Sequence, residues 1–367
     1  MLRDILILRL NWMSDMKDLE KEYENTNKKK LLMIASAIII MLVSAYVFTT
    51  LGMKNISAMQ TFVAISKAFC GTLDNGADAA SNKMIMLLRL PRIALAMLAG
   101  IGLAVSGAVM QSLTRNYLVS PFTLGISSAA AFGASMSIVF GVGLFFQSEV
   151  GMISCAFMAS CICGCIVYGI SRYIGLNPSS IVLVGISLNY LFSAMTATIE
   201  FFAKEHKLEA VVQWTFGSFN RATWDSVLIT AGVICLGFVV LMLYSLKLNV
   251  MATNNDEMAK SLGININKAR VICGMTSILL TATIISFTGV IGFVGLIAPH
   301  IARVLIGDNH FYYLPFASVL GGVLLLFSDM IGKFILYPVN IPVGIVISFL
   351  GVPLFMHLIL VKRRSLE

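Results

Sequence analysis

The sequence predicts an all-α membrane protein, a polytopic helix bundle of about ten transmembrane helices. Hydrophobic residues make up 58% of the chain and charged residues only 12%, and the mean hydropathy is +0.89. This composition excludes a soluble globular domain. Several apolar runs are each long enough to cross about 30 Å of hydrocarbon, which takes roughly 20 helical residues.

Glycine, proline and charged residues separate the apolar runs and mark the ends of the predicted helices. The first run is too long for the core of a signal peptide and lacks a small-residue cleavage site, so we keep it as a span. The predicted spans are 31–53, 90–113, 121–143, 150–172, 179–202, 226–247, 269–291, 294–306, 313–334 and 342–361. The eighth span is short and contains Pro299.

Lysine and arginine gather between the spans, so we interpret the net charge of +8 as a topology signal and not as a nucleic-acid site. With the N-terminus inside, 17 of the 26 Lys and Arg residues fall on the inner side, as the positive-inside rule requires. Both termini are then cytoplasmic, in a multi-pass protein of the plasma or inner membrane. We expect a cytoplasmic lead-in at 1–30, a transmembrane domain at 31–362 and a cytoplasmic tail at 363–367.

Seven cysteines do not indicate a disulfide framework, because most of them lie in apolar runs. Cys155, Cys161, Cys163 and Cys165 share one predicted helix, where residues two apart point to different faces. We interpret them as packing residues, since a metal site needs a recognisable ligand spacing. His300 follows a proline and is interpreted as a hydrogen-bonding partner for freed backbone, not as an iron ligand.

Small residues recur at helix-packing spacing in the second span, where Gly100, Ala104 and Ala108 lie on one stripe. Such stripes allow close helix approach in lipid, where van der Waals contact drives association. A short echo also relates SGAV at 106–109 to TGVI at 288–291, in spans that run in opposite directions. The echo favours an inverted repeat, which is common among transporters.

The longest inner loop, MATNNDEMAKSLGININKAR, predicts a short helix outside the membrane. Thr253 is expected to cap this helix with Asp256 as its capping-box partner, and Gly263 is expected to end it. Met258 and Leu262 lie four residues apart and form a small apolar knob. A capped helix with exposed apolar residues is more typical of a docking surface than of a solvated connector.

The chain carries no phosphate-binding loop. Its nearest approach, Gly332-Lys333-Phe334, lacks the upstream glycine and the following Ser or Thr and lies in an apolar helix. No paired acids or clustered histidines indicate an enzyme. We therefore expect no catalytic residue, metal or cofactor on this chain, and we expect ATP and Mg²⁺ to act on a partner subunit.

Ionisable residues are scarce within the predicted spans, where they are costly and usually functional. Glu200 lies near the outer end of its span, and Asp329 has Lys333 one turn later, so a local ion pair is expected. An ion-coupled secondary carrier, the alternative from another class, would hold more carboxylates at mid-membrane. This scarcity therefore disfavours the carrier.

A rigid pair of cations is predicted at the start of the second span. Arg89 and Arg92 flank Pro91, and proline in a first helical turn fixes the backbone. Their spacing of three residues is expected to put both guanidinium groups on one side. Such a pair suits an acidic partner.

Taken together, the motifs of this chain resemble the FecCD-type permeases, the membrane subunits of ABC importers for ferric siderophores, haem and vitamin B12. The resemblance extends over nearly the whole chain from residue 31 onward. The motifs are RLPR at 89–92, SGAVMQ at 106–111, the Asn116 turn, SPFTLGISS at 120–128, GFVGLIAPHIAR at 292–303, LP at 314–315, IPVGI at 341–345 and Gly351-Val352-Pro353.

The resemblance implies a vitamin B12 permease-like fold and a set of partners. It implies a second permease subunit, identical or different, that shares a central path, two cytoplasmic ABC ATPase subunits and an extracytoplasmic substrate-binding protein. Membrane lipid is the only other expected partner, and nucleic acid is not one. A ferric siderophore is the commonest cargo of the family and is the expected one here, with haem and cobalamin as alternatives.

The resemblance also implies three groups of site residues. Arg89, Arg92 and Lys333 match the cations that receive acidic residues of the binding protein. The segment 251–268 matches the part that seats in an ATPase cleft, and its coupling residues are Asp256, Glu257, Met258, Ala259, Leu262 and Gly263. The gate candidates, on inner turns where the family closes its path, are Asn116, Leu118, Ser179 and Ser180.

Overall fold

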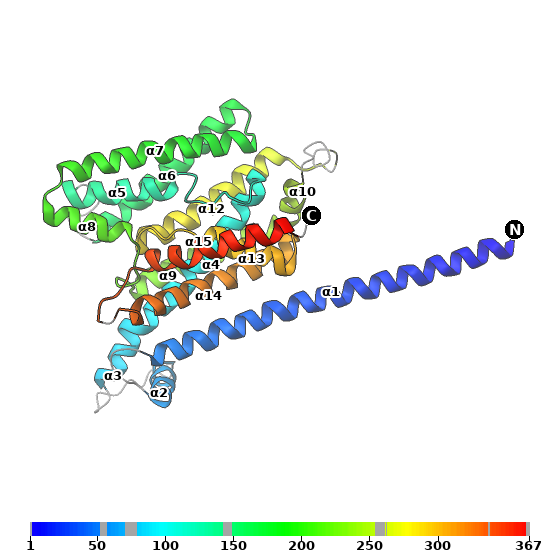
Figure 1. Cartoon of the computed structure of the whole chain (residues 1–367), viewed down its shortest axis with the longest axis horizontal. Helices are drawn as coiled ribbons and strands as arrows, with labels where there is room; N and C mark the ends of the chain where they lie inside the picture. The colour runs from blue at the N-terminus through cyan, green and yellow to red at the C-terminus, as the bar shows by residue number, and fades with distance from the viewer. Residues whose placement is uncertain are drawn as a thin grey trace.

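The computed structural model describes residues 2–51, 57–69, 79–141, 149–253, 261, 263–336 and 338–364. Within these ranges all regular secondary structure is helical, as the sequence predicts. The helices form a bundle of roughly aligned segments, and the first half of α1 projects far beyond the rest (Figure 1).

The ten predicted spans all coincide with apolar helices. Among the described residues, seven helices contain a segment long and apolar enough to cross a membrane: α1 (Leu2–Thr50), α4 (Leu90–Thr114), α6 (Glu149–Ile174), α7 (Pro178–Phe202), α9 (Trp224–Leu243), α12 (Ile266–Thr288) and α14 (His310–Phe334). Three shorter apolar helices complete the set: α5 (Ile126–Phe140), α13 (Val294–Ile306) and α15 (Val343–Arg364).

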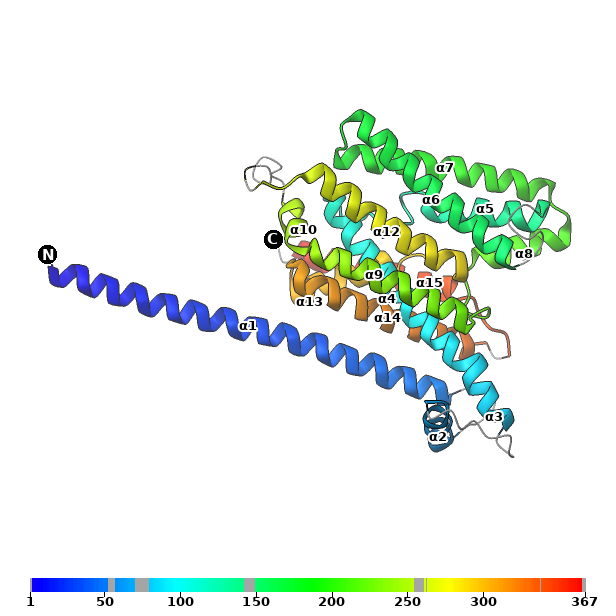
Figure 2. The ribbon, with the colours of Figure 1, turned by 180° about the vertical axis from the view of Figure 1, so that it is seen from behind.

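The bundle has two distinguishable ends. At one end, called here the α10 end, lie α10 (Ser245–Ala252) and the last turns of α15 (Figures 1 and 2). At the opposite end, called the α3 end, lie α2 (Ala58–Phe69), α3 (Ala79–Met84) and α8 (Glu205–Thr215). The sequence did not predict the four short helices α2, α3, α8 and α10.

The helix α1 runs without a break from Leu2 to Thr50, so it includes the predicted lead-in at 1–30, whose cytoplasmic location stays a prediction. One predicted helix boundary was wrong. The third span begins only at Ile126, because the preceding residues form turns. Thr123 closes one of them, since its Oγ1 donates to Ser120 O at 2.8 Å and accepts from Ser120 N at 3.0 Å.

The sequence predicted that a helix begins at RLPR. In the structure the helix begins earlier. It continues back through a π-helical turn, η1 (Ile85–Arg89), into α3. The Leu90 N–H bonds to Ile85 O, five residues earlier, and this turn rearranges the hydrogen-bond ladder just before Pro91. The turn ends at Arg89, and regular α-helix begins at Leu90.

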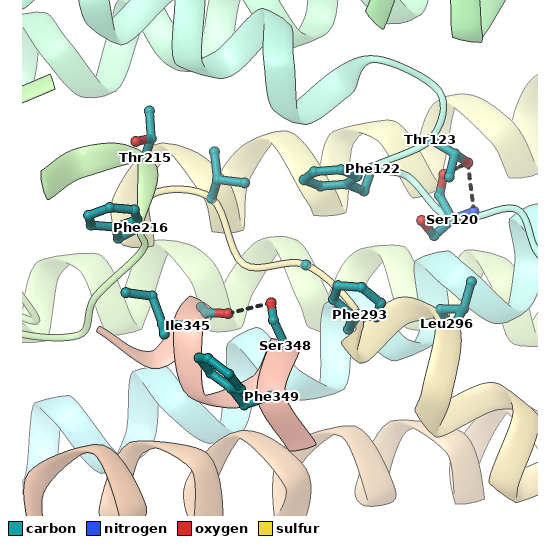
Figure 3. A pocket seen from close by; sticks show the side chains of 13 residues that line it. Ser120, Phe122, Thr123, Thr215, Phe216, Phe293, Leu296, Ile345, Ser348 and Phe349 are labelled. Atoms are coloured by element: carbon teal, nitrogen blue, oxygen red, sulfur yellow. Dashed lines mark hydrogen bonds between the residues drawn. The ribbon is translucent and has the colours of Figure 1, made fainter. Parts of the chain in front are cut away.

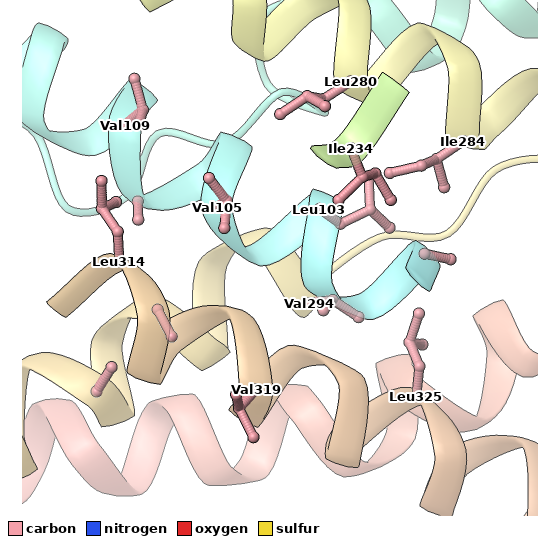
Figure 4. Close-up of a cluster of buried hydrophobic side chains, with 14 of the residues drawn as sticks. Leu103, Val105, Val109, Ile234, Leu280, Ile284, Val294, Leu314, Val319 and Leu325 are labelled. Carbon is pink, nitrogen blue, oxygen red and sulfur yellow. The ribbon is translucent and has the colours of Figure 1, made fainter. Parts of the chain in front are cut away.

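The helix α4 is the centre of the bundle and packs against α14, α12, α13 and α9. Leu103, Val105 and Val109 of α4 belong to a buried apolar cluster with Ile284 of α12 and Leu314 of α14 (Figure 4). Glycine allows the closest approaches. A Cβ on Gly100 would lie 2.2 Å from Gly321 O, and a Cβ on Gly107 would lie 1.8 Å from Gly295 O.

Replacing Gly107 with alanine is expected to lower the free energy of unfolding by about 1–3 kcal/mol, because the new methyl group overlaps a backbone oxygen that cannot turn away. Gly169→Ala on α6 is the matched control, since nothing lies within 4 Å of the added Cβ there. Denaturation of both variants in the same detergent measures the difference. Equal stabilities would show that α4 and α13 are not in backbone contact.

A second layer contains α5, α6, α7 and α8, and α12 joins it to the α4 layer (Figure 1). The similar sequences at 106–109 and 288–291 do not have similar structures. Gly107 lies inside α4, whereas Gly289 follows the last residue of α12 and has a φ of 74°. The two segments therefore occupy different structural positions, and the four matching residues are no evidence for the repeat.

Candidate functional site

A cavity of about 450 Å³ lies in the middle of the bundle (Figure 3). We call it the central cavity. Four interrupted segments line it: the turn before α5, the end of α8, the link between α12 and α13, and the first turns of α15. The lining residues are Ser120, Phe122, Thr123, Thr215, Phe216, Val290, Gly292, Phe293, Leu296, Gly344, Ile345, Ser348 and Phe349.

Backbone contacts hold these interrupted segments together. A Cβ on Gly217 would lie 2.4 Å from Val290 O, one on Gly289 would lie 2.3 Å from Trp214 O, and one on Gly344 would lie 2.3 Å from Phe216 O. Gly217 and Gly289 also have φ values of 68° and 74°, which side chains rarely adopt. Non-helical backbone in a membrane protein is tolerated where it is buried in protein or lines a cavity, and these interruptions line one.

The wall of the central cavity is apolar with a few hydroxyl groups. Phe122, Phe216, Phe293 and Phe349 point toward it from four segments (Figure 3). The Ser348 hydroxyl donates to Gly344 O at 2.7 Å and is thus bonded within its own helix. None of the described residues that line the cavity carries a charge. Such a wall admits a large molecule without binding it tightly, which suits passage.

The sequence analysis did not identify the central cavity, although two family motifs cover much of its wall. SPFTLGISS contributes Ser120, Phe122 and Thr123, and GFVGLIAPHIAR contributes Gly292, Phe293 and Leu296. The available signal was the run TGVIGFVG, which interrupts an apolar stretch with three glycines. Only the fold shows that these residues meet the end of α8 and the start of α15.

The α3 end holds a buried ion cluster around Asp329, whose side chain is 5% exposed. The Arg92 fork binds both carboxylate oxygens, with Nη2 2.7 Å from Oδ1 and Nε 2.9 Å from Oδ2. Lys333 Nζ lies 3.3 Å from Oδ2, which confirms the predicted ion pair one turn along α14. One carboxylate thus faces two cations, and the cluster keeps a net charge of one positive unit.

Arg89 and Arg92 have different hydrogen-bond partners, and their predicted common role in docking stays a prediction. Arg89 Nη1 donates to the carbonyl oxygens of Thr49 at 2.7 Å and Thr50 at 3.1 Å, and so holds the end of α1. Arg92 reaches Asp329 and also donates to Asn220 Oδ1. The π-helical turn ends at Arg89, so the backbone from Arg89 to Arg92 is α-helical.

The gate candidates lie in two turns at the α10 end. Asn116 Oδ1 accepts from Leu118 N at 3.0 Å, and the Leu118 side chain is exposed. Ser179 and Ser180 are in the first turn of α7, where the Ser180 hydroxyl donates to Asn177 O at 2.8 Å. The gating role of these residues stays a prediction.

Most of the predicted coupling residues, Asp256, Glu257, Met258, Ala259 and Leu262, lie outside the described residues. Gly263 is described and has a φ of 73°, as expected of a glycine that ends a helix. Thr253 ends α10, and its hydroxyl donates to Val250 O at 2.6 Å. Its predicted capping box with Asp256 stays untested.

A polar network at the α10 end was not predicted. The ring of His310, 1% exposed, lies 2.6 Å from Ser112 Oγ through Nε2 and 2.6 Å from Asn249 Oδ1 through Nδ1. It therefore joins α4, α10 and α14 one turn before the coupling segment. Nearby, Arg303 pairs with Asp308 and stacks on Tyr117 with its guanidinium carbon 3.9 Å from the ring centre.

Histidine and cysteine residues do not gather into a metal site in the described part of the chain, where no three potential ligands come together. His300 is 7% exposed and packs edge-on against Phe355 with ring centres 5.6 Å apart. The four cysteines predicted on one helix are all on α6, with Cys163 buried and Cys165 exposed.

Comparison with known proteins identifies the family of this chain. The sequence profile of the FecCD transport family matches residues 30–362. This chain belongs to the FecCD family. It is 34% identical to the Fe(3+)-citrate import system permease protein YfmD of Bacillus subtilis (strain 168) over 275 residues, which cover 75% of this chain and 80% of the relative.

Further relatives of this FecCD family member agree in sequence and in structure. The hemin transport system permease protein HmuU of Yersinia pestis is 33% identical over 307 residues, covering 82% of this chain and 90% of the relative. A metal-chelate type ABC transporter solved in an inward-facing conformation superposes with a TM-score of 0.77 at 28% identity, covering 90% of this chain and 99% of that one. The chain is therefore a multi-pass membrane permease of the ABC transporter type.

Proposed function

We propose that the chain is the permease subunit of a binding-protein-dependent ABC importer and carries a metal chelate, in the first place a ferric siderophore. The central cavity supports this most directly, because interrupted helices form an uncharged wall that lets a bulky cargo pass. Relatives named for Fe(3+)-citrate and hemin transport support the cargo class. Haem is the second candidate, favoured by the match to the hemin permease, and cobalamin is the third.

The proposed arrangement places the α10 end in the cytoplasm and the α3 end outside. Two ATPase subunits would bind at the segment 251–268, a second permease subunit would complete the path, and an extracytoplasmic binding protein would dock at the α3 end near Arg89, Arg92 and Lys333. Asn116, Leu118, Ser179 and Ser180 would close the path on the cytoplasmic side. ATP and Mg²⁺ would act only on the ATPase subunits.

The test is reconstitution of the permease in lipid with the ATPase and binding protein from its own genomic neighbourhood. Binding protein loaded with ferric siderophore is expected to stimulate ATP hydrolysis and chelate uptake. Alanine at Glu257 and Leu262 is expected to abolish stimulation while membrane insertion stays normal, because these residues would seat in the ATPase cleft. Ion-driven uptake by the permease alone would overturn the proposal and establish a secondary carrier.

A further inference from the structure

A second cavity, of about 540 Å³, lies at the α3 end. We call it the polar cavity. It lies between α8, the loop from 216 to 223, and the approach to α15. The lining residues that matter here are Arg92, Gln213, Trp214, Asn220, Arg221 and Asp329. Except for Arg92 and Asp329, none of these was a candidate in the sequence analysis.

The polar cavity has an excess of positive charge. Asp329 is already shared by Arg92 and Lys333, so it has no capacity left to neutralise Arg221. Within the described part of the chain Arg221 forms no ion pair, and its Nη1 lies 3.5 Å from the Met152 sulfur. Burial lowers the pKa of Arg221, and the carboxylate of Glu149 partly opposes this shift. A half-buried guanidinium without an ion-pair partner favours an anion.

Neutral donors and an aromatic wall accompany this charge. Trp214 is 2% exposed, and its indole N–H has no acceptor among the described residues. Gln213 and Asn220 add amide groups at the rim. The volume falls within the range of roughly 300–1,000 Å³ that small-molecule sites occupy. It is far larger than one acidic side chain of a docking protein would fill.

The polar cavity adjoins the central cavity along two chain segments. Trp214 lines the polar cavity, and the next two residues, Thr215 and Phe216, line the central one. In the same way Val343 lines the first and Gly344 the second. The walls of the two cavities are thus continuous along the chain at both places.

We propose that the polar cavity is an entry site that binds the carboxylate groups of an acidic metal chelate, with Arg221 as its principal anion-binding residue. This inference rests on the proposed function and narrows its cargo to chelates with free carboxylates. The planar guanidinium matches a carboxylate in two parallel hydrogen bonds. Passage into the central cavity then exchanges these bonds for weak apolar contact, which allows release.

The test measures chelate binding to the complete permease alone, in lipid nanodiscs, by equilibrium dialysis. The probes are ferric citrate, which has free carboxylates, and a neutral ferric hydroxamate chelate. Arg221→Gln is expected to raise the Kd for ferric citrate about tenfold, which is the effect of losing one charge-assisted pair. Arg221→Lys keeps the positive charge but lacks the planar guanidinium. Its Kd for ferric citrate is expected to lie between those of the wild type and Arg221→Gln. Lys204→Gln, an exposed cation at the same end, is the control and is expected to leave Kd unchanged.

Three results would overturn this inference while leaving the proposed function intact. In the first, the wild type supports uptake in the reconstituted importer but shows no saturable binding of ferric citrate. In the second, Arg221→Gln raises the Kd of both chelates by the same factor, which would show that the site does not distinguish a charged chelate from a neutral one. In the third, the variant weakens docking of the binding protein but not chelate binding, which assigns the cavity to an acidic side chain. Failure of wild-type uptake with any loaded binding protein would count against the proposed function instead.

Discussion

Replacing Asp329 with alanine is expected to destabilise the protein by about 3–5 kcal/mol, because removing one partner of a buried ion pair strands the others. Arg92 and Lys333 have side chains only 15% and 22% exposed, and both lose their carboxylate in this variant. The cluster also joins α4 to α14, the pair of helices at the centre of the bundle. Denaturation in detergent, with yield from the membrane as a second readout, measures the loss.

A triple variant separates burial of charge from the cluster's function. Arg92→Met, Asp329→Leu and Lys333→Met together replace the ion cluster with apolar residues of similar size, a change that is often neutral for stability. The free energy of unfolding of this variant is expected to be close to that of the wild type. If it is as unstable as Asp329→Ala, stranded charge is not the reason for the loss. Its docking of the binding protein then tests whether these cations have the role that the family resemblance assigns them.

The fold was largely predictable because lipid imposes a simple rule. A helix that crosses hydrocarbon needs a long apolar run, and each of the ten predicted spans meets one apolar helix. The short helices were not predicted because the search used apolar runs long enough to span a membrane, and these helices are too short. The helix α8 has 11 residues and includes the charged residues Glu205, Lys207 and Glu209, so its sequence resembles a polar loop.

The candidate site was predicted only where the partners are neighbours in sequence. Lys333 lies one turn from Asp329 on the same helix, and that pair was found. Arg92 is 237 positions from Asp329, and no local pattern relates them. The contacts of Arg89 with the end of α1 were not predicted either, because Thr49 and Thr50 lie 40 and 39 positions away.

Cavities are even harder to predict from sequence, because their walls come from several segments that are far apart in the chain. The central cavity takes its wall from four segments between residues 120 and 349, and only packing brings them together. The sequence did contain the local signal of interrupted helices, in the glycines at 289 and 292 and at 217. Which interruptions meet at one point depends on backbone contacts such as those of Gly217 with Val290 and of Gly344 with Phe216.

Narrowing the central cavity is expected to stop transport without unfolding the permease. A Cβ on Gly292 would meet only the Phe122 ring, at 3.8 Å, so Gly292→Leu fits the backbone and extends into the cavity toward that ring. Uptake of a bulky chelate is expected to fall by about tenfold or more, because passage depends on the width of the constriction. ATP hydrolysis stimulated by the binding protein is expected to persist, since the substitution narrows the cavity and leaves the sequence of the coupling segment unchanged.

Gly169→Leu is the matched control for this block, because it adds the same side chain to α6 where nothing lies within 4 Å of the new Cβ. It is expected to leave uptake unchanged. Uptake and ATP hydrolysis measured on the same proteoliposomes separate a blocked path from a failed assembly. If Gly292→Leu transports a chelate as fast as Gly169→Leu does, cargo does not pass through the central cavity. The central cavity would then be no part of the path that the two permease subunits are proposed to share.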